Sequence, residues 1–244
     1  MDRKVFGFIL LIAVLLTTGC GTNGWDIQYR PNLYDTPYFS FHEGEERFSD
    51  QTITVFDFLD DRINQTHVGV EYKKLNRAPQ RFVASRPIGK TVTEAIATTL
   101  ESMGYTVVRS SGWNLNPSDL KDLTTDLALG GKIKVFYAEK QPAGVNTYIL
   151  GHSGINTYAT VNLRVVVADP SMKKVLWEGD LIGTEVYQSV STFGIGSPET
   201  KYMLEKAFAK AVIQLAEDPS LREVWRKAKR LDERKGLTLL EVRF

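Results

Sequence analysis

The sequence predicts an α+β fold: a mainly antiparallel sheet, helices packed on one of its faces, and a helical tail at the C-terminus. Three observations predict it. Two segments with helical spacing of apolar residues follow segments rich in β-branched residues. Three strand-like segments with alternating polarity follow one another in residues 127–188. A turn-forming segment, 169–174, joins the last two of these strands, which favours antiparallel neighbours.

The first 19 residues have the features of an export signal. Arg3 and Lys4 precede an apolar run over residues 5–16, which is shorter than the roughly 20 residues that a membrane-spanning helix needs. The run ends in "TTGC", which resembles the lipobox of bacterial lipoproteins, although Thr17 takes the place where that pattern prefers leucine. We therefore interpret residues 1–19 as a lipoprotein signal peptide.

Cys20 is the only cysteine of the chain, and an unpaired thiol is a liability in an oxidising compartment. The alternative is an ordinary secretory peptide with a stray cysteine. We expect lipidation of Cys20, so that the chain reaches the membrane through its lipid. By resemblance to this class, Gly21 implies sorting to the outer membrane, with the protein facing the periplasm.

Charge and composition limit the partners. Loss of residues 1–19 removes two basic side chains and one acidic side chain, which lowers the formal charge from +1 to zero. No basic stripe predicts a nucleic-acid partner. No Cys/His spacing predicts a zinc site, and we expect neither a metal nor a cofactor.

Residues 20–50 are interpreted as a lipidated tether with an aromatic arm, because they are rich in Gly, Asn, Pro and Asp and lack periodicity. The aromatic residues pack along the surface of the domain or form an arm that binds a partner. They are Trp25, Tyr29, Tyr34, Tyr38, Phe39 and Phe41.

An α+β domain is expected over residues 51–217. Its first half predicts strands at 53–59, 66–76, 81–84 and 105–108. A helix precedes the last of these strands and ends at Gly104, in the position of a left-handed C-cap. Its apolar face is predicted to hold Val92, Ile96, Thr99, Leu100 and Met103.

The second half predicts a three-stranded meander and a long helix. In the first strand Leu127, Leu129, Ile133, Val135 and Tyr137 are expected to face the core, with Lys132 and Lys134 facing away. The next strands cover 159–167 and 175–188. The helix of residues 199–218 carries one apolar stripe, formed by Leu204, Phe208, Ala211, Val212 and Leu215.

Residues 218–244 predict an amphipathic basic tail that begins with Asp218 as N-cap and Pro219 at the first helical position. A helix of about 14 residues is marginal alone in water. It therefore docks on its own domain, on a second subunit or on an anionic membrane. Under the second alternative, Leu221 and Trp225 are candidate partner contacts.

The segment "ASRPIGKT", residues 84–91, fits the pattern of a phosphate-binding loop. Pro87 lacks the N–H that such a loop needs, and Ile88 is branched and bulky. Thr91 and Glu94 fit a capping box instead, with Gly89 forming the turn before the helix. We expect no nucleotide binding.

Other candidate chemistry is sparse. Asp57, Asp60 and Asp61 are expected at a solvated strand end, and the histidines lie far apart without a Ser–His–Asp arrangement, so we expect no enzyme. Two long glycine-bearing loops, 142–158 and 189–199, carry the apolar residues Ile149 and Phe193. These residues contact a partner or fold over the core of their own domain.

Three segments make the chain resemble the YajG-type family of bacterial lipoproteins: "VFDFLDDRINQTHVGVEY", "TVTEAIATTLESMGYTVV" and "VNLRVVVADPSMKKVLWEGD". The resemblance covers roughly residues 51–217 and concerns the fold. Related envelope lipoproteins include an activator of a penicillin-binding protein and subunits of curli and exopolysaccharide export. The resemblance therefore implies an adaptor or an assembly role without catalysis, and it assigns no site residues.

The leading hypothesis is an outer-membrane-anchored periplasmic adaptor or assembly factor that binds envelope proteins or copies of itself. The alternative is a lipoprotein that binds peptidoglycan or a small ligand, and an enzyme is the third class. An adaptor should expose an apolar patch. A binding module should have a pocket with convergent polar groups, and an enzyme should have close titratable pairs with shifted pKa values.

Overall fold

The computed structural model of the chain describes residues 24–30, 51–72, 78–120, 123–142, 153–191 and 199–225. The predicted signal peptide, Cys20, Ile149, Phe193 and the tail beyond residue 225 lie outside these ranges. Within them, no helix is long and apolar enough to span a membrane.

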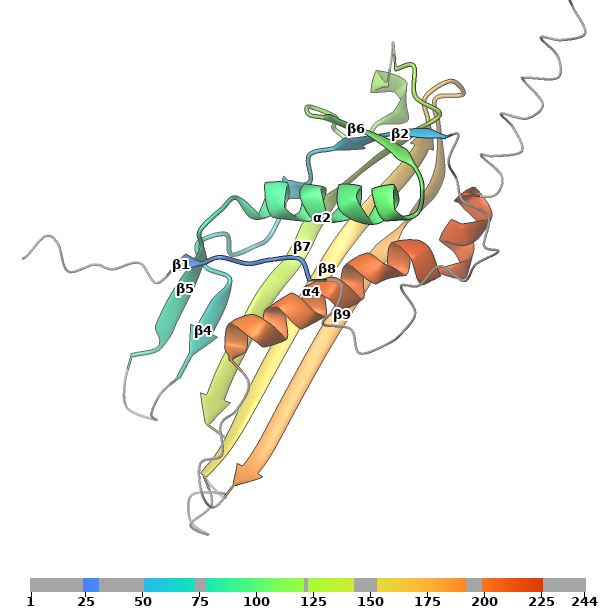
Figure 1. Ribbon diagram of the computed structural model, residues 1–244. Helices are drawn as coiled ribbons and strands as arrows, with labels where there is room; N and C mark the ends of the chain where they lie inside the picture. Colours follow the sequence, from blue (N-terminus) through green and yellow to red (C-terminus); the bar gives the residue numbers. More distant parts are fainter. Residues whose placement is uncertain are drawn as a thin grey trace, which may run out of the picture.

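In the described residues, five short strands precede helix α2, one more short strand follows it, and three long strands and helix α4 complete the fold (Figure 1). In order they are β1 (Gly24–Trp25), β2 (Thr52–Phe56), β3 (Leu59–Asp60), β4 (Gly69–Glu71), β5 (Gln80–Ala84), α2 (Ile88–Ser102), β6 (Thr106–Ser110), the 3-10 helix η3 (Pro117–Asp119), β7 (Leu127–Pro142), β8 (Ser153–Asp169), β9 (Lys174–Ser191) and α4 (Thr200–Glu217). Residues 219–225 are also helical.

The predicted meander is present, because β8 pairs antiparallel with both β7 and β9. The prediction of a mainly antiparallel sheet is nevertheless wrong. Strand β2 pairs in parallel with both β6 and β7, and β1 pairs in parallel with β5. For β2 and β6 the reason is that α2 carries the chain back across the sheet, so β6 starts from the same end as β2.

One edge of β7 is shared by three short strands in succession. Strands β2, β3 and β4 pair in parallel with residues 127–129, 132–133 and 138–140 of β7. Residues 52–71 therefore follow β7 as one interrupted strand. The result is a mixed sheet that curls into a half-barrel.

Helices α2 and α4 both lie against the same face of this sheet, which we call the inner face (Figure 1). Phe208 of α4 contacts Phe136 of β7 edge to face, with ring centroids 5.2 Å apart. Helix α4 approaches β9 so closely at Gly183 that a Cβ atom there would overlap the carbonyl of Ala207. The main core lies between the helices and the sheet.

The start of α2 differs from the predicted capping box. The helix begins at Ile88 with Pro87 as N-cap and no side-chain cap, so Thr91 lies inside the helix. Gly89 is also helical, and a Cβ atom there would lie 2.5 Å from the carbonyl oxygen of Phe58. Close packing on the chain after β2 therefore explains this glycine. The predicted C-cap is confirmed, since Gly104 has a φ of 98°.

The start of the tail belongs to the core. Asp218 caps residues 219–225 as predicted, because its Oδ1 accepts hydrogen bonds from the N–H groups of Ser220 at 2.8 Å and Leu221 at 3.1 Å. Leu221 and Trp225 are fully buried, and the indole of Trp225 donates to the Leu215 carbonyl at 3.1 Å. These two side chains therefore dock on their own domain, and the hypothesis that they contact a partner is wrong.

Candidate functional site

We call the side of strands β7–β9 that faces away from the helices the outer face. A bulge in β7 decides which residues of this strand lie on it. The predicted alternation holds as far as Ile133, which is buried, but the pairing with β8 shifts between Ile133 and Val135. Beyond the shift Phe136 and Ala138 are buried, whereas Val135 is 37% exposed. The predicted placement of Val135 and Tyr137 in the core is therefore wrong. A bulge opposes two residues to one, which turns every following side chain to the other face.

Beyond the bulge, three rows of paired residues form a surface that we call the outer patch. The rows are Val135–Asn162–Ile182, Tyr137–Thr160–Thr184 and Glu139–Tyr158–Val186. Ile182 is 47% exposed and Val186 is 59% exposed. Glu139 is the one acidic residue among the nine, and none of the nine is basic. The patch therefore combines exposed aliphatic carbon with hydroxyl groups.

Polar rows bound the outer patch at both ends. At one end lies the row Lys132–Arg164–Asp180, in which Arg164 is paired with Asp180 at 3.5 Å and with Glu178 at 3.1 Å. At the other end the row is formed by Gln141, Asn156 and Gln188. An apolar centre with a polar rim is the usual anatomy of a protein interface.

The other half of the outer face is covered by the chain itself. Trp113 and Leu120, from the segment that contains η3, pack there on Phe56. The remaining buried residues of this second cluster are Ala128, Val166 and Ala168. Gly130 leaves room for Trp113, since a Cβ atom there would lie 2.8 Å from its ring. Within the described part of the chain, this cover therefore ends before the outer patch begins.

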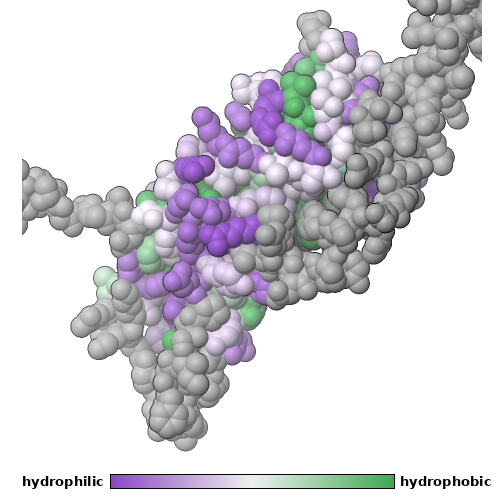
Figure 2. Space-filling model, viewed as in Figure 1, coloured by the Kyte–Doolittle hydropathy of each residue, from purple (hydrophilic) through white to green (hydrophobic). Residues whose placement is uncertain are grey.

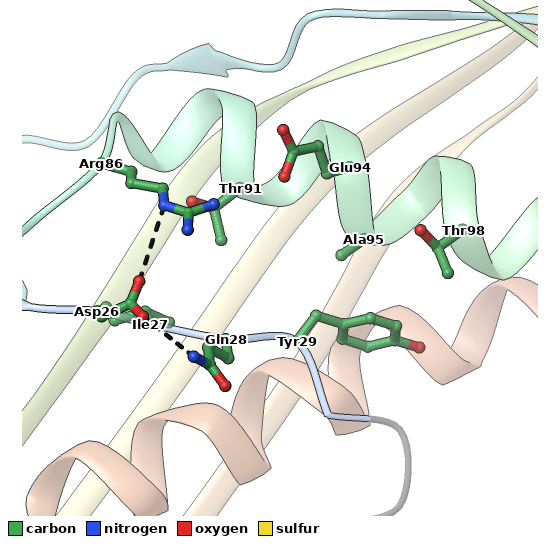
Figure 3. Close-up of a pocket in the computed structure, with 9 residues that line it drawn as sticks. All are labelled: Asp26, Ile27, Gln28, Tyr29, Arg86, Thr91, Glu94, Ala95 and Thr98. Carbon is green, nitrogen blue, oxygen red and sulfur yellow. Dashed lines mark hydrogen bonds and ion pairs between the residues drawn. The ribbon is translucent and has the colours of Figure 1, made fainter.

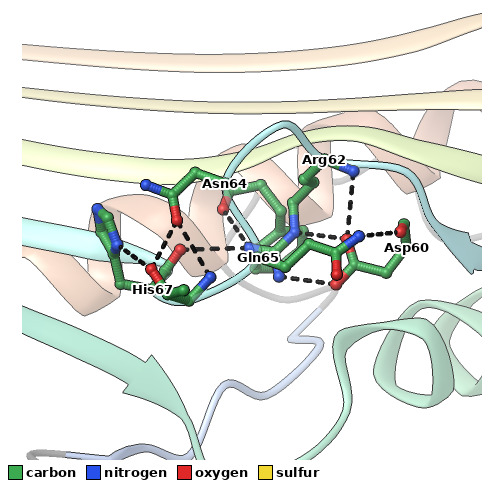
Figure 4. Close-up of polar contacts among 7 residues, drawn as sticks. Asp60, Arg62, Asn64, Gln65 and His67 are labelled. Carbon is green, nitrogen blue, oxygen red and sulfur yellow. Dashed lines mark hydrogen bonds and ion pairs between the residues drawn. The ribbon is translucent and has the colours of Figure 1, made fainter.

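A polar loop of residues 61–68 joins β3 to β4 beside the outer patch, because β3 and β4 pair with residues 132–133 and 138–140 of β7. Figure 4 shows polar contacts within this loop and with Asp60. Arg62, which is 7% exposed, donates from Nε to Asp60 Oδ1 at 2.7 Å and from Nη1 to the Phe136 carbonyl at 3.3 Å. The second bond gives this carbonyl a donor where the strand pairing along β7 is interrupted. The hydrogen bond from Arg62 also lowers the pKa of Asp60. Arg62 thus holds a loop that presents a completely exposed Ile63.

His67, at the end of this loop, contacts Tyr137 edge to face, with ring centroids 5.8 Å apart. Partial burial lowers the pKa of His67, and the charges of Arg81 and Arg62 lower it further. Burial, followed by the charge of Glu139, raises the pKa of Tyr137 to about 12. Both rings are therefore mostly uncharged at neutral pH.

A groove of about 390 Å³ lies on the other side of the molecule, between residues 26–29 and helix α2 (Figure 3). Arg86 and Asp26 form an ion pair across one end at 3.8 Å, and the Gln28 amide donates to Asp26 at 3.0 Å. Thr91, Glu94 and Thr98 complete its polar lining. The coloured surface of this helical side is mostly hydrophilic (Figure 2).

The residues of the phosphate-loop pattern have other partners. The N–H of Ser85 donates to the Trp25 carbonyl at 2.9 Å, and Arg86 pairs with Asp26.

The acidic and histidine side chains form no metal site in the described residues. Asp61 pairs with Lys132 and Lys134. Among the described residues there is no group of three or more metal-ligating side chains. His42 and His152 lie outside those residues.

The comparisons with known proteins add little. No protein-family model matches the sequence, and no curated protein is significantly similar to it. Similar solved structures include a neuraminyllactose-binding hemagglutinin homolog from Helicobacter pylori, with 10% identity and a TM-score of 0.44 over 84% of this chain and 99% of that one. A Xanthomonas campestris protein of the family DUF330 has 14% identity and a TM-score of 0.40, over 75% and 88%.

Lipoprotein GNA1162 from Neisseria meningitidis has 16% identity and a TM-score of 0.29, over 68% of this chain and 99% of that one. Likenesses this weak carry no inference about this chain. The resemblance to the YajG-type family therefore stays a prediction from the three sequence segments.

No motif in the sequence marks the outer patch, although β9 carries a signal for it. Along one face of this strand the residues change from Glu178 and Asp180 to Ile182, Thr184 and Val186. Where the exposed face of a strand changes from charged to apolar residues, the apolar part indicates a site of interaction.

Proposed function

We propose that the chain is a lipid-anchored protein of the bacterial envelope that binds another protein through the outer patch and performs no catalysis. The observation that carries this proposal is the exposure of Val135, Ile182 and Val186 on the half of a sheet face that none of the described segments covers. Export and lipidation rest on the signal-like residues 1–19 and on Cys20. Sorting to the outer membrane, with the domain in the periplasm, rests on Gly21.

The composition of the patch suits a protein partner. Tyr137 and Tyr158 combine a large apolar surface with a hydroxyl group that forms hydrogen bonds, which is why tyrosine is enriched at interfaces. Thr160 and Thr184 lie between the apolar side chains and add further hydroxyl groups. A partner can therefore bury carbon here without leaving a charged group unpaired at the centre.

The outer patch is large enough only for the centre of the proposed interface. Three rows span about 14 Å along the strands, and three strands span about 10 Å. A standard interface buries about 800 Å² on each partner. The contact must therefore extend over the row of Arg164 or over the loop that presents Ile63.

The test replaces Val186 by lysine in the full-length protein and compares the partners captured by in vivo crosslinking. The matched control is Val108→Lys on β6, because Val108 is 46% exposed and lies in a strand outside the outer patch. We expect Val186→Lys to lose one specific crosslinked species that Val108→Lys retains. Equal crosslinking in both variants would exclude the outer patch. Analytical ultracentrifugation distinguishes a second copy of the chain from another protein.

Lipidation has a separate test. Wild-type protein should sediment with membranes and carry acyl chains on its N-terminal residue by mass spectrometry, while Cys20→Ala should remain in the soluble periplasmic fraction. A soluble wild-type protein would contradict the anchor.

The groove of Figure 3 supports a second candidate, which is binding of a small polar ligand such as a peptidoglycan fragment. Arg86 and Asp26 give it a cation and a carboxylate close together, and muropeptides carry both kinds of charge. We expect Arg86→Ala to weaken sedimentation with purified sacculi, and Arg109→Ala serves as a control away from the groove. Failure of the wild-type protein to sediment with sacculi would remove this candidate.

A further inference from the structure

Residues 24–30, which we call the N-terminal strap, are built into the domain, although the sequence places them in the tether. Of the two alternatives for the aromatic residues of this segment, packing on the domain is the one that holds for Trp25 and Tyr29. Strand β1 pairs in parallel with β5, and Trp25 stacks on Phe82 with ring centroids 4.3 Å apart. Gly69 leaves room for this ring, since a Cβ atom there would lie 2.6 Å from Trp25. The absence of a side chain on β4 therefore provides the space that Trp25 of the strap fills.

The rest of the strap is anchored in the layer between the two helices. Ile27 is 6% exposed and belongs to the main core. The hydroxyl groups of Tyr29 and Thr99 of α2 are hydrogen-bonded at 2.9 Å. The Tyr29 ring packs edge to face on Phe208 of α4, with centroids 5.6 Å apart. The strap thus contacts β5, α2 and α4.

A buried carboxylate on α4 completes the anchoring. Glu205, whose side chain is 3% exposed, accepts the N–H of Gln28 at 3.0 Å and pairs with Arg30 at 3.7 Å. Lys201 also pairs with it, at 3.6 Å. Removing the strap would leave this carboxylate without two of its partners. Because burying a charge without its partners is costly, the strap is expected to stay docked.

The docked strap leaves little chain for a tether. From Cys20 to Gly24 there are four Cα–Cα steps, which span at most about 14 Å when fully extended. A flexible tether of about 30 residues would instead have a root-mean-square end-to-end distance of about 30 Å. The first docked residue is therefore held within about 14 Å of any lipid on Cys20.

We infer that the lipid on Cys20 holds the corner of the domain formed by β1 and β5 against phospholipid headgroups. This inference rests on the lipid anchor of the proposed function. The corner lies at one side of the molecule, where β1 enters the fold (Figure 1). It exposes the cation Arg81, whose sign suits lipid phosphates, beside Arg86, which pairs with Asp26. The outer patch then meets its partner close to the membrane surface.

The test measures how near two sites lie to the bilayer in the full-length lipidated protein. Arg86→Cys and Met172→Cys each introduce a free thiol for a fluorophore, because acylation occupies Cys20. Met172 is 52% exposed in the β8–β9 turn, far from β1 (Figure 1). Headgroup spin-labelled phospholipid should quench the fluorophore at position 86 several-fold more than the fluorophore at position 172.

A second variant tests whether the short connection to Cys20, and not nonspecific adsorption to the lipid, places position 86 near the bilayer. A Gly/Ser insertion of 30 residues between Thr22 and Asn23 should reduce quenching at position 86 to the level at position 172, with an unchanged melting transition. Equal quenching at both sites in membrane-bound protein without the insertion would overturn the inference and leave the anchor intact. Quenching at position 86 that survives the insertion would also overturn it. Absence of the protein from membranes would overturn the anchor and the inference together.

Discussion

The two faces of the β7–β9 sheet are made by the same strands and differ in what covers them. On the inner face, side chains such as Val161 and Leu163 are fully buried beneath the helices. On the outer face, the chain covers one end with Trp113 and leaves Ile182 and Val186 exposed at the other. The stability of this domain therefore explains the apolar residues of the inner face but not those of the outer patch.

The free energy gained by burying apolar side chains supports this conclusion. Full burial of a Val or Ile side chain contributes about 1.5–3 kcal/mol relative to exposure. The inner face gains this free energy in the folded chain, whereas Ile182 and Val186 gain only part of it. The remaining part becomes available when a partner covers the outer patch.

The largest expected effect tests whether the start of the tail belongs to the inner layer. Trp225→Ala should lower the free energy of unfolding by about 3–5 kcal/mol, because Trp225 is fully buried and packs on Tyr105 with centroids 5.7 Å apart. Urea denaturation measures the change, and Met172→Ala serves as the exposed control. An unchanged midpoint would show that Trp225 is not part of the core.

A smaller effect is expected from a glycine of the inner face. Gly183→Ala should destabilise the domain by about 1–3 kcal/mol, because the new Cβ would force α4 away from β9 at the Ala207 carbonyl. Thr184→Ala, one residue further and on the outer face, should change the stability by less than 0.5 kcal/mol (roughly the surface limit). Equal effects of the two substitutions in thermal melts would break the distinction between the faces.

In the outer patch, a substitution should weaken binding of the partner without changing the stability of the domain. Val186→Lys should leave the free energy of unfolding within about 0.5 kcal/mol of wild type, because Val186 is 59% exposed. The same variant is the one expected to lose the partner. A Val186→Lys domain that melts far below wild type would mean that this face contributes to folding, and its loss of binding would then have another explanation.

The smallest expected effect concerns pH at the edge of the outer patch. The pKa of His67 is lowered in the folded protein, so the unfolded chain binds the proton more readily. The free energy of unfolding should therefore fall as the pH drops below about 6.5, the ordinary value for histidine, and through the lowered pKa. His67→Gln should fall less between pH 7.5 and 5.5 in urea titrations. A steeper fall in the variant would reverse the sign and contradict the burial argument.

Much of the fold could be predicted, and the failures share a cause. The helical spacing of Val92, Ile96 and Leu100 gave the buried face of α2 correctly. The capping box at Thr91 failed because the helix starts one turn earlier, at Ile88. Local patterns show which residues are suited to an element, but the neighbouring strands decide where that element begins.

The candidate site was harder to predict, because no motif marks it. Val135 and Tyr137 continue the alternation of β7, so the sequence places them in the core. Trp225 lies on an apolar stripe that suits a partner and a core equally, and the structure buries it in its own domain. Both errors concern which surface meets an apolar side chain, which is a question about contacts between distant segments.

The sequence by itself determined most of the elements, the antiparallel meander, and the two helix ends fixed by Gly104 and Asp218, because backbone preference and polarity patterns act over a few residues. Only the tertiary structure decided the parallel strands beside β7, the docking of the strap and the faces of β7 after its bulge. These depend on pairing between segments far apart in the chain. A shift of one residue in such pairing reverses every following side chain, and no local pattern records it.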